Sequence, residues 1–226
     1  MLQSWQALID AGVIEDRYGS LAINKPEALS GDLHISDGIT KFSGSGAFEN
    51  NTVLTGIFFP ASFATFNNAD FRNCSSLQVV VFNENSAVTV IAGECFYGCK
   101  SLSAVHLPSN LTTIRDSAFR NCSNIVNINL PDTITTIGSF ALAGCSSLTE
   151  IRIPSQTTKL PNAMFDDCTN LTRVDIHDNV QSFGSQCFDG CSLLENIYIP
   201  EGVTSLPFAF ARRCTSLKNI NLPSSM

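Results

Sequence analysis

The stretch Cys122–Gly144, CSNIVNINLPDTITTIGSFALAG, decides the fold because the chain repeats its pattern at a fixed period of twenty-three, the step from Cys122 to Cys145. Shifting the sequence along itself brings seven cysteines to one place, and Asn51 stands at that place one unit before the first of them. The seven are Cys74, Cys99, Cys122, Cys145, Cys168, Cys191 and Cys214. The first step, from Cys74 to Cys99, is longer by two positions. A fixed period in the twenties is typical of a solenoid of stacked coils.

The pattern inside the unit predicts a short strand in each coil. Apolar residues stand three, six and eight positions after the cysteine, as Ile125, Ile128 and Leu130 do. The last two alternate with a variable residue, which indicates a strand with one buried face. Pro131 then removes a ladder donor and ends the strand. A second apolar pair follows, and most units have a phenylalanine such as Phe119 three residues before the next cysteine.

These residues carry a family resemblance. The unit from Cys145 to Cys168, CSSLTEIRIPSQTTKLPNAMFDDC, resembles the leucine-rich repeat of the BspA-like family of bacterial and protozoan surface proteins. The resemblance covers about residues 33–226 and implies a right-handed solenoid whose parallel strands line one face. It also implies adhesion to host or matrix proteins, and a cell-surface or secreted location. No secretion signal follows Met1, so an intracellular location remains an alternative.

The chain divides into two parts. Residues 1–32 lie outside the repeat, and we expect a short helix over 4–11, closed by Gly12, with Leu2, Trp5 and Leu8 on or near one face. This part would cap the first coil. Residues 33–226 form the array, with turns and short helical or 3-10 segments besides the strands. Its last coil is incomplete, which suggests a fragment of a longer array or an end-to-end contact between chains.

Composition excludes two classes of partner. The net charge of −7 argues against binding driven by phosphate neutralisation, so we expect no nucleic acid. The sequence has no apolar run of the ~20 residues that a membrane helix needs, so we expect no membrane insertion.

The cysteines are expected to be structural. Equivalent positions in stacked coils predict a column of thiols spaced by ~4.8 Å, in which buried cysteine acts as a small apolar residue. Disulfides, which this spacing would permit, and a metal site are the alternatives. Cys95 and Cys187 leave the column and take the place that Ala118 and Ala141 have in other units. We expect no metal and no cofactor.

No catalytic constellation is visible. The three histidines, His34, His106 and His177, occupy different places in the repeat, so none is paired with a nucleophile by spacing. Hydrolase, zinc-protease and phosphate-loop motifs do not occur in the sequence. We therefore predict no catalytic residues and a non-enzymatic protein.

The variable strand position predicts the binding surface. It must point outward from the sheet, and it is filled by Phe58, Val81, His106, Asn129, Arg152, Asp175, Tyr198 and Asn221. We expect a protein-binding patch centred on Arg152, Arg173, Asp175 and Tyr198, with His106 and Phe58 on the same face, because arginine and tyrosine are enriched in binding hot spots. The plainer alternative is that the N-terminal segment covers the apolar part of this face and water solvates the rest.

Two functions follow from this face. The first is a protein-interaction or adhesion module, and the second is a structural spacer or accessory segment of a longer surface or particle protein. Polysaccharide binding would need regularly spaced aromatic residues, and Phe58 and Tyr198 are the only ones in the outward strand positions.

Overall fold

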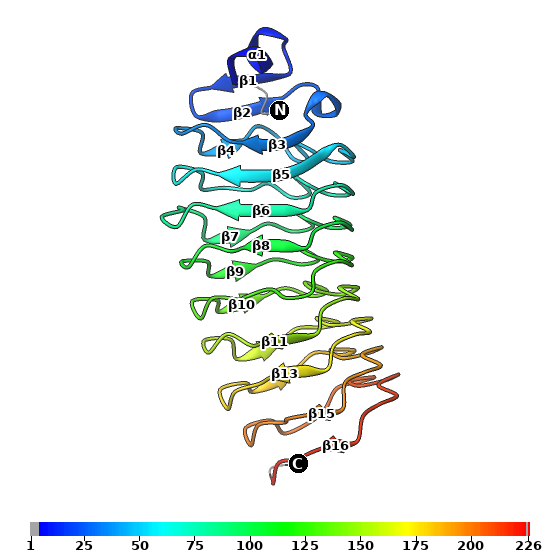
Figure 1. Cartoon of the computed structure of the whole chain (residues 1–226). Helices are drawn as coiled ribbons and strands as arrows, with labels where there is room; N and C mark the ends of the chain where they lie inside the picture. The colour runs from blue at the N-terminus through cyan, green and yellow to red at the C-terminus, as the bar shows by residue number, and fades with distance from the viewer. Residues whose placement is uncertain (1–4, 225) are drawn as a thin grey trace.

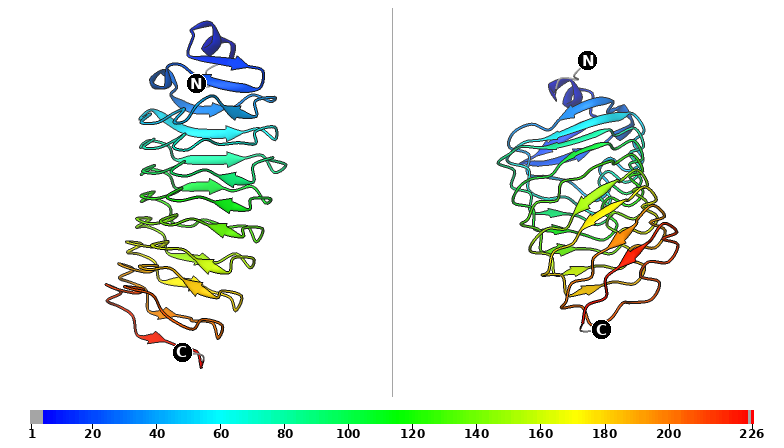
Figure 2. Two further views of the ribbon diagram at one scale, coloured as in Figure 1. Left: turned by 180° about the vertical axis from the view of Figure 1, so that it is seen from behind. Right: turned by 60° about the horizontal axis from the view of Figure 1, so that its bottom comes forward.

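The protein is an elongated stack of coils with a small N-terminal cap at one end (Figure 1). The computed structural model describes residues 5–224 and 226, and only the backbone of Trp5 and Arg17. The predicted solenoid is confirmed, and one continuous apolar core runs through it from Leu8 to Phe210. Figure 2 shows from two further sides that the coils stack one after another along the length of the molecule.

The first face of the stack carries the strands predicted from the period-two pattern. Neighbouring strands run parallel, as β5 and β6 do, with Ile57 beside Val80. The strands of this first face are β3 (Gly31–His34), β5 (Leu54–Phe59), β6 (Val79–Phe82), β8 (Ala104–His106), β11 (Glu150–Arg152), β13 (Arg173–Asp175), β15 (Asn196–Ile197) and β16 (Asn219–Ile220).

A second set of strands lies on another face and was not expected from the sequence. The second apolar pair of each unit supplies them, because its last residue is buried beside an extended and often β-branched neighbour. These second-face strands are β4 (Lys41–Phe42), β7 (Val90–Ile91), β9 (Thr113–Ile114), β10 (Thr136–Ile137), β12 (Lys159–Leu160) and β14 (Ser182–Phe183). In the described part of the array, turns occupy the rest of each coil.

The extra two residues between Cys74 and Cys99 leave the stacking intact. Val79 pairs with Ala104 across the longer step, whereas Gly56 pairs with Val79 across a step of the ordinary length. The two extra residues therefore lie in the turn that follows β6, where a longer loop leaves the strand register and its hydrogen bonds unchanged.

Phenylalanine rings form a ladder through the core. Neighbouring rings stack with centroids 4.8 to 5.6 Å apart and planes within 11° of parallel. The stacked pairs are Phe48–Phe71, Phe71–Phe96, Phe96–Phe119 and Phe165–Phe188. Leu142 interrupts the ladder between Phe119 and Phe165, as its place in the repeat predicts. This stacking fits the ~4.8 Å strand spacing, so aromatic packing and strand pairing reinforce each other.

The predicted column of free thiols is confirmed, and the structure gives its physical reason. All nine cysteines are unpaired, and all but the half-buried Cys214 are buried. Each column thiol donates a hydrogen bond to a backbone carbonyl of the preceding coil, at Sγ–O distances of 3.0 to 3.3 Å. Cys122, for example, donates to Phe96. Asn51 opens the column, and its amide donates to the carbonyls of Pro26 and Leu29.

The turn edge shows a repeat of two coils rather than one. The residue before each column cysteine has a positive φ, and from Asn73 to Gly190 its identity alternates between Asn or Asp and Gly, whereas Arg213 stands before Cys214. The three alternating pairs are Asn73–Gly98, Asn121–Gly144 and Asp167–Gly190. A Cβ at Gly144 would overlap Oδ1 of Asn121, so the side chain of Asn121 needs glycine at this place in the next coil.

The cap begins with α1 (Trp5–Asp10), followed by β1 (Ile14–Arg17), β2 (Ser20–Ile23) and the short 3-10 helix η1 (Pro26–Ala28). Gly12 has a φ of 64° and donates to the carbonyl of Ile9, which ends the helix as expected. β1 and β2 are antiparallel, and β2 pairs with β4 of the array. The expected contribution of Leu2 and of the Trp5 side chain lies outside the described residues.

Candidate functional site

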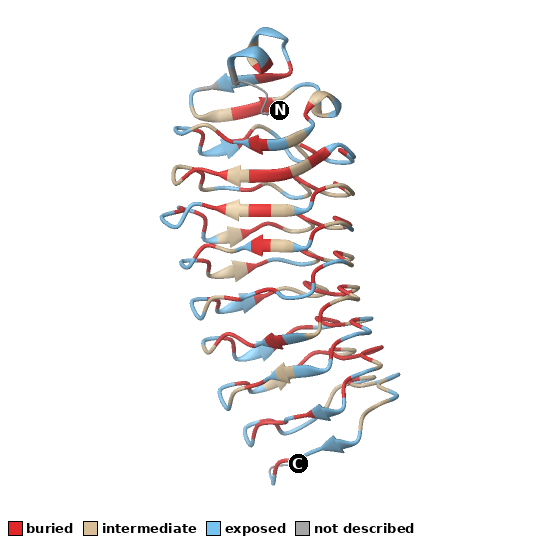
Figure 3. Cartoon of the chain, in the orientation of Figure 1, coloured by how far each residue is buried: buried red, intermediate tan, exposed pale blue. Residues whose placement is uncertain are grey.

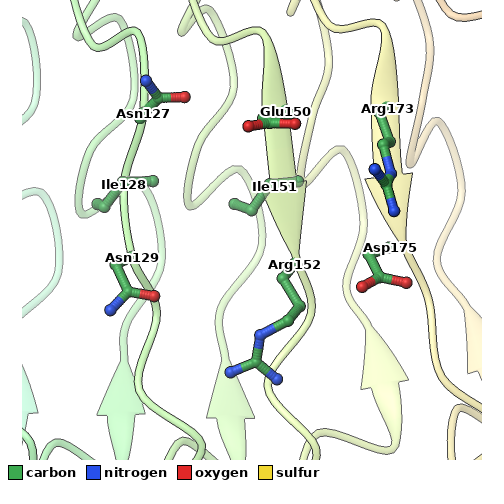
Figure 4. A pocket seen from close by; sticks show the side chains of 8 residues that line it. All are labelled: Asn127, Ile128, Asn129, Glu150, Ile151, Arg152, Arg173 and Asp175. Carbon is green, nitrogen blue, oxygen red and sulfur yellow. The ribbon is translucent and has the colours of Figure 1, made fainter.

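The first face carries an open groove of about 360 Å³ near its middle. Eight residues from three successive coils line it, and Figure 4 shows their side chains. They are Asn127, Ile128, Asn129, Glu150, Ile151, Arg152, Arg173 and Asp175. Three of the six candidate binding residues therefore lie together, as the repeat predicted.

The strand alternation builds this groove. Ile128 and Ile151 turn inward and are only 6% and 5% exposed, so they form its apolar floor. The polar residues on either side of them in each coil point outward and form its walls (Figure 4). The exposure of the strand residues increases along the first face. Figure 3 shows buried and intermediate residues on β5 and β6, and exposed residues on β13 and β15.

Arg152 is anchored by the preceding coil. Its two terminal nitrogens each donate to a different carboxylate oxygen of Asp132 at 2.9 Å. Asp132 also accepts the backbone N–H of Ser155 at 2.8 Å. The hydrogen bonds from Arg152, joined by that of Ser155, hold the pKa of Asp132 well below its usual range. Both side chains are about half exposed, at 49% and 52%, so this pair fixes the arginine more than it stabilises the fold.

Tyr198 repeats this arrangement two coils later. Its hydroxyl donates to Oδ1 of Asp178 at 2.6 Å, and this hydrogen bond raises the pKa of Tyr198. Asp178 holds the same place in its unit as Asp132, ten residues after the column cysteine. An outward side chain thus reaches a carboxylate 20 residues back in both cases, and two of the candidate residues are held by their own chain.

Three of the four charged residues that line the groove are outside any ion pair among the described residues. Glu150 is the strand neighbour of Arg173, and Arg152 is the strand neighbour of Asp175. Within residues 5–224, Glu150, Arg173 and Asp175 form no ion pair, and Asp175 lies beside the anchored Arg152. An unpaired guanidinium at a groove can bind a carboxylate through two parallel hydrogen bonds.

The remaining candidate residues, His106 and Phe58, lie outside the groove, as does Tyr198. His106, on β8, is exposed one coil before it. Phe58, on β5, is half-buried and stacks on His34 with ring centroids 4.1 Å apart and planes 1° from parallel. The described cap residues stack on the end of the solenoid (Figure 1), and His34 of the array covers one side of Phe58.

Sequence reasoning missed part of the groove. Asn127, Asn129 and Glu150 line it, and they occupy the same two outward columns as the predicted patch. Asp132 was missed as well, although Asp178 at the equivalent position was a usable signal. The polar character of these residues alone does not show whether they line a groove or lie on an ordinary solvated surface.

The thiols offer no reactive centre. Burial raises the pKa of the Cys145 thiol to about 12, and burial likewise raises that of Cys214 to about 11. Among the described residues there is no group of three or more His, Cys, Asp or Glu side chains that could hold a metal ion. Over the same residues, no helix has the length and apolar character needed to cross a membrane.

Short parallel strands, a leucine- and isoleucine-lined core and a polar groove on the strand face define a leucine-rich-repeat solenoid. A family model of the BspA type leucine rich repeat region matches residues 30–126 and 112–226, and the chain belongs to this family. The family suggests a protein-interaction module, and its members are repeat proteins that are generally non-enzymatic. Among proteins with curated functions, none matches the chain significantly.

Several solved structures resemble the fold, and two bacterial proteins are among them. The T. pallidum leucine-rich repeat protein TpLRR is 23% identical with a TM-score of 0.72, and the match covers 81% of this chain and 89% of that one. A leucine-rich repeat protein from Eubacterium ventriosum is 20% identical with a TM-score of 0.59, over 87% of this chain and 62% of that one. At this identity the likeness concerns the fold alone.

Proposed function

We propose that the protein is a non-enzymatic interaction module, and that it binds a protein partner in the groove on its first face. The observation that carries this proposal is the free guanidinium of Arg173 beside the anchored Arg152, above an apolar floor. Arginine and a nearby tyrosine on a rigid sheet are typical of binding hot spots. The concave surfaces of repeat arrays are commonly used in this way.

Adhesion is the finer form of this function. The family resemblance supports a partner among host or matrix proteins and a place at the cell surface or outside the cell. Antibody labelling of intact cells of the source organism checks the location, and labelling that requires permeabilisation would contradict it.

A binding screen with matched variants tests the groove. The immobilised protein is probed with a panel of purified extracellular-matrix and serum proteins, and each hit is measured again with Arg173→Ala and Tyr198→Ala. Arg115→Ala is the control, because Arg115 is exposed just after the second-face strand β9. We expect tenfold weaker binding for Arg173→Ala and no change for the control. Equal affinity for all variants, with folding intact, removes the groove from consideration.

A structural spacer is the second candidate, and exposed apolar residues on the last described coil favour it. Leu222 is 62% exposed and Ile220 is 37% exposed, so another stacked unit would bury both. Sedimentation of wild type and Leu222→Lys tests an end-to-end contact between chains. Association that is present in wild type and lost in the variant supports the spacer, and monomers at all concentrations argue against it.

A further inference from the structure

We propose that the groove selects an extended peptide segment that carries one acidic and one basic side chain two residues apart. This inference rests on the proposed function and names the chemistry of its partner. In the bound state, the acidic side chain of the peptide pairs with Arg173 and its basic side chain pairs with Glu150.

The charge balance of the groove supports a partner with both signs. Four ionised residues line the hollow, and they form a square in which each positive side chain has a negative strand neighbour. Asp132 already neutralises Arg152 through two hydrogen bonds. Asp175 faces that anchored arginine, whose pKa it helps to raise after the larger effect of Asp132. Glu150 and Arg173 therefore remain as the pair whose charges a partner can meet.

Their separation sets the spacing of the partner's side chains. Glu150 and Arg173 are registered neighbours on parallel strands, so their backbones lie ~4.8 Å apart across the sheet. In an extended segment, residues i and i+2 point to the same side and are ~6.7 Å apart. Long acidic and basic side chains are flexible enough to span the small difference between these two distances. Because the two charges come from neighbouring strands, the segment must lie across the strands, along the length of the solenoid.

The size of the groove also favours a short segment. Its volume of about 360 Å³ is near the lower limit of the ~300–1,000 Å³ found for ligand sites, so it admits a few side chains. Asn127 and Asn129 line the same hollow and offer amide donors and acceptors to the backbone of such a segment. An all-acidic segment would meet the carboxylates of Glu150 and Asp175, and an all-basic one would meet Arg173.

A peptide-display experiment tests this selectivity. A phage library of random nine-residue peptides is selected on the full chain, and the binders are resynthesised for affinity measurement. We expect enrichment of peptides with an acid and a base two residues apart. Replacing the peptide's acid by its amide should weaken binding three- to tenfold to wild type but not to Arg173→Gln. Replacing the base by norleucine should weaken binding to wild type but not to Glu150→Gln. Arg115→Gln, on the second face, should behave as wild type.

The outcomes separate this inference from the proposed function. Peptides that lose affinity on both groove variants but carry no acid–base pattern overturn the inference and leave the groove as the binding site. Peptides that bind all variants equally, while circular dichroism shows each to be folded, overturn both. Sedimentation of the protein alone is measured in parallel, and a dimer abolished by Arg173→Gln would identify a second copy as the occupant and overturn the peptide assignment.

Discussion

Asp70 makes the stability of this protein depend on pH in an unusual direction. Its side chain is fully buried in the place that Cys95 and Ala118 fill in other coils. The carboxylate accepts backbone N–H groups from Asn67 at 2.7 Å and from Ala47 at 3.3 Å. Burial raises its pKa from 3.8 to about 7, and these hydrogen bonds offset only part of that effect. In the folded protein Asp70 therefore holds its proton up to neutral pH.

The sign of the effect follows from proton linkage. Between about pH 4 and pH 7 the folded state binds more protons at Asp70 than the unfolded state, so the free energy of unfolding falls as pH rises. The stabilisation that Asp70 contributes is complete below about pH 4 and is lost above about pH 7. The difference between 3.8 and about 7, at about 1.4 kcal/mol for each pKa unit, corresponds to a loss of about 4 kcal/mol.

Urea denaturation of wild type and Asp70→Asn at pH 5 and pH 8.5 measures this loss. Asparagine is the neutral isostere of the protonated acid and keeps one acceptor oxygen, so the variant should be the more stable protein at pH 8.5. Because pH 5 already lies above the unfolded pKa of 3.8, the change in unfolding free energy between the two pH values should be about 2.5 to 3 kcal/mol larger for wild type. Subtracting the variant removes the contributions of the exposed groups. An equal pH dependence for both proteins would refute the assignment of a neutral, buried Asp70.

Three further substitutions test the packing by their effect on the urea midpoint. Cys122→Ala removes the thiol donor to the Phe96 carbonyl and should cost about 1 to 2 kcal/mol; an unchanged midpoint would mean that the thiol column is dispensable. Gly144→Ala should cost at least about 1 to 2 kcal/mol, because φ is 72° and the new Cβ overlaps Asn121; a neutral result would contradict the two-coil alternation. Phe119→Ala should cost about 3 to 5 kcal/mol, and a loss below about 1 kcal/mol would contradict the aromatic ladder.

The interior could be predicted from the sequence because the same packing recurs in every coil. Each coil must present the same side chains to identical neighbours, so the period, the buried strand residues and the thiol column all followed from the spacing. The second-face strands did not follow, because their apolar residues are three apart, as in Leu111 and Ile114, and lack the period-two signal. The single Asp70 in an otherwise apolar column was also missed, because one exception in a repeat shows no pattern.

The groove could be predicted only in part. The outward columns placed Arg152, Arg173 and Asp175 together, since a parallel stack aligns equivalent positions. Sequence did not indicate which charges pair within the chain. That depends on side-chain direction across coils, as in the contact of Arg152 with Asp132 20 residues earlier, which leaves Arg173 as the available guanidinium.

Photo-cross-linking from two positions tests most directly whether the first face is the binding surface. The photoreactive residue p-benzoylphenylalanine is placed at position 129, in the groove, or at position 136, which is exposed on β10 of the second face. Both proteins are irradiated with a matrix or serum protein that binds wild type. We expect a covalent adduct from position 129 and none from position 136. An adduct from position 136 alone would contradict a binding site on the first face.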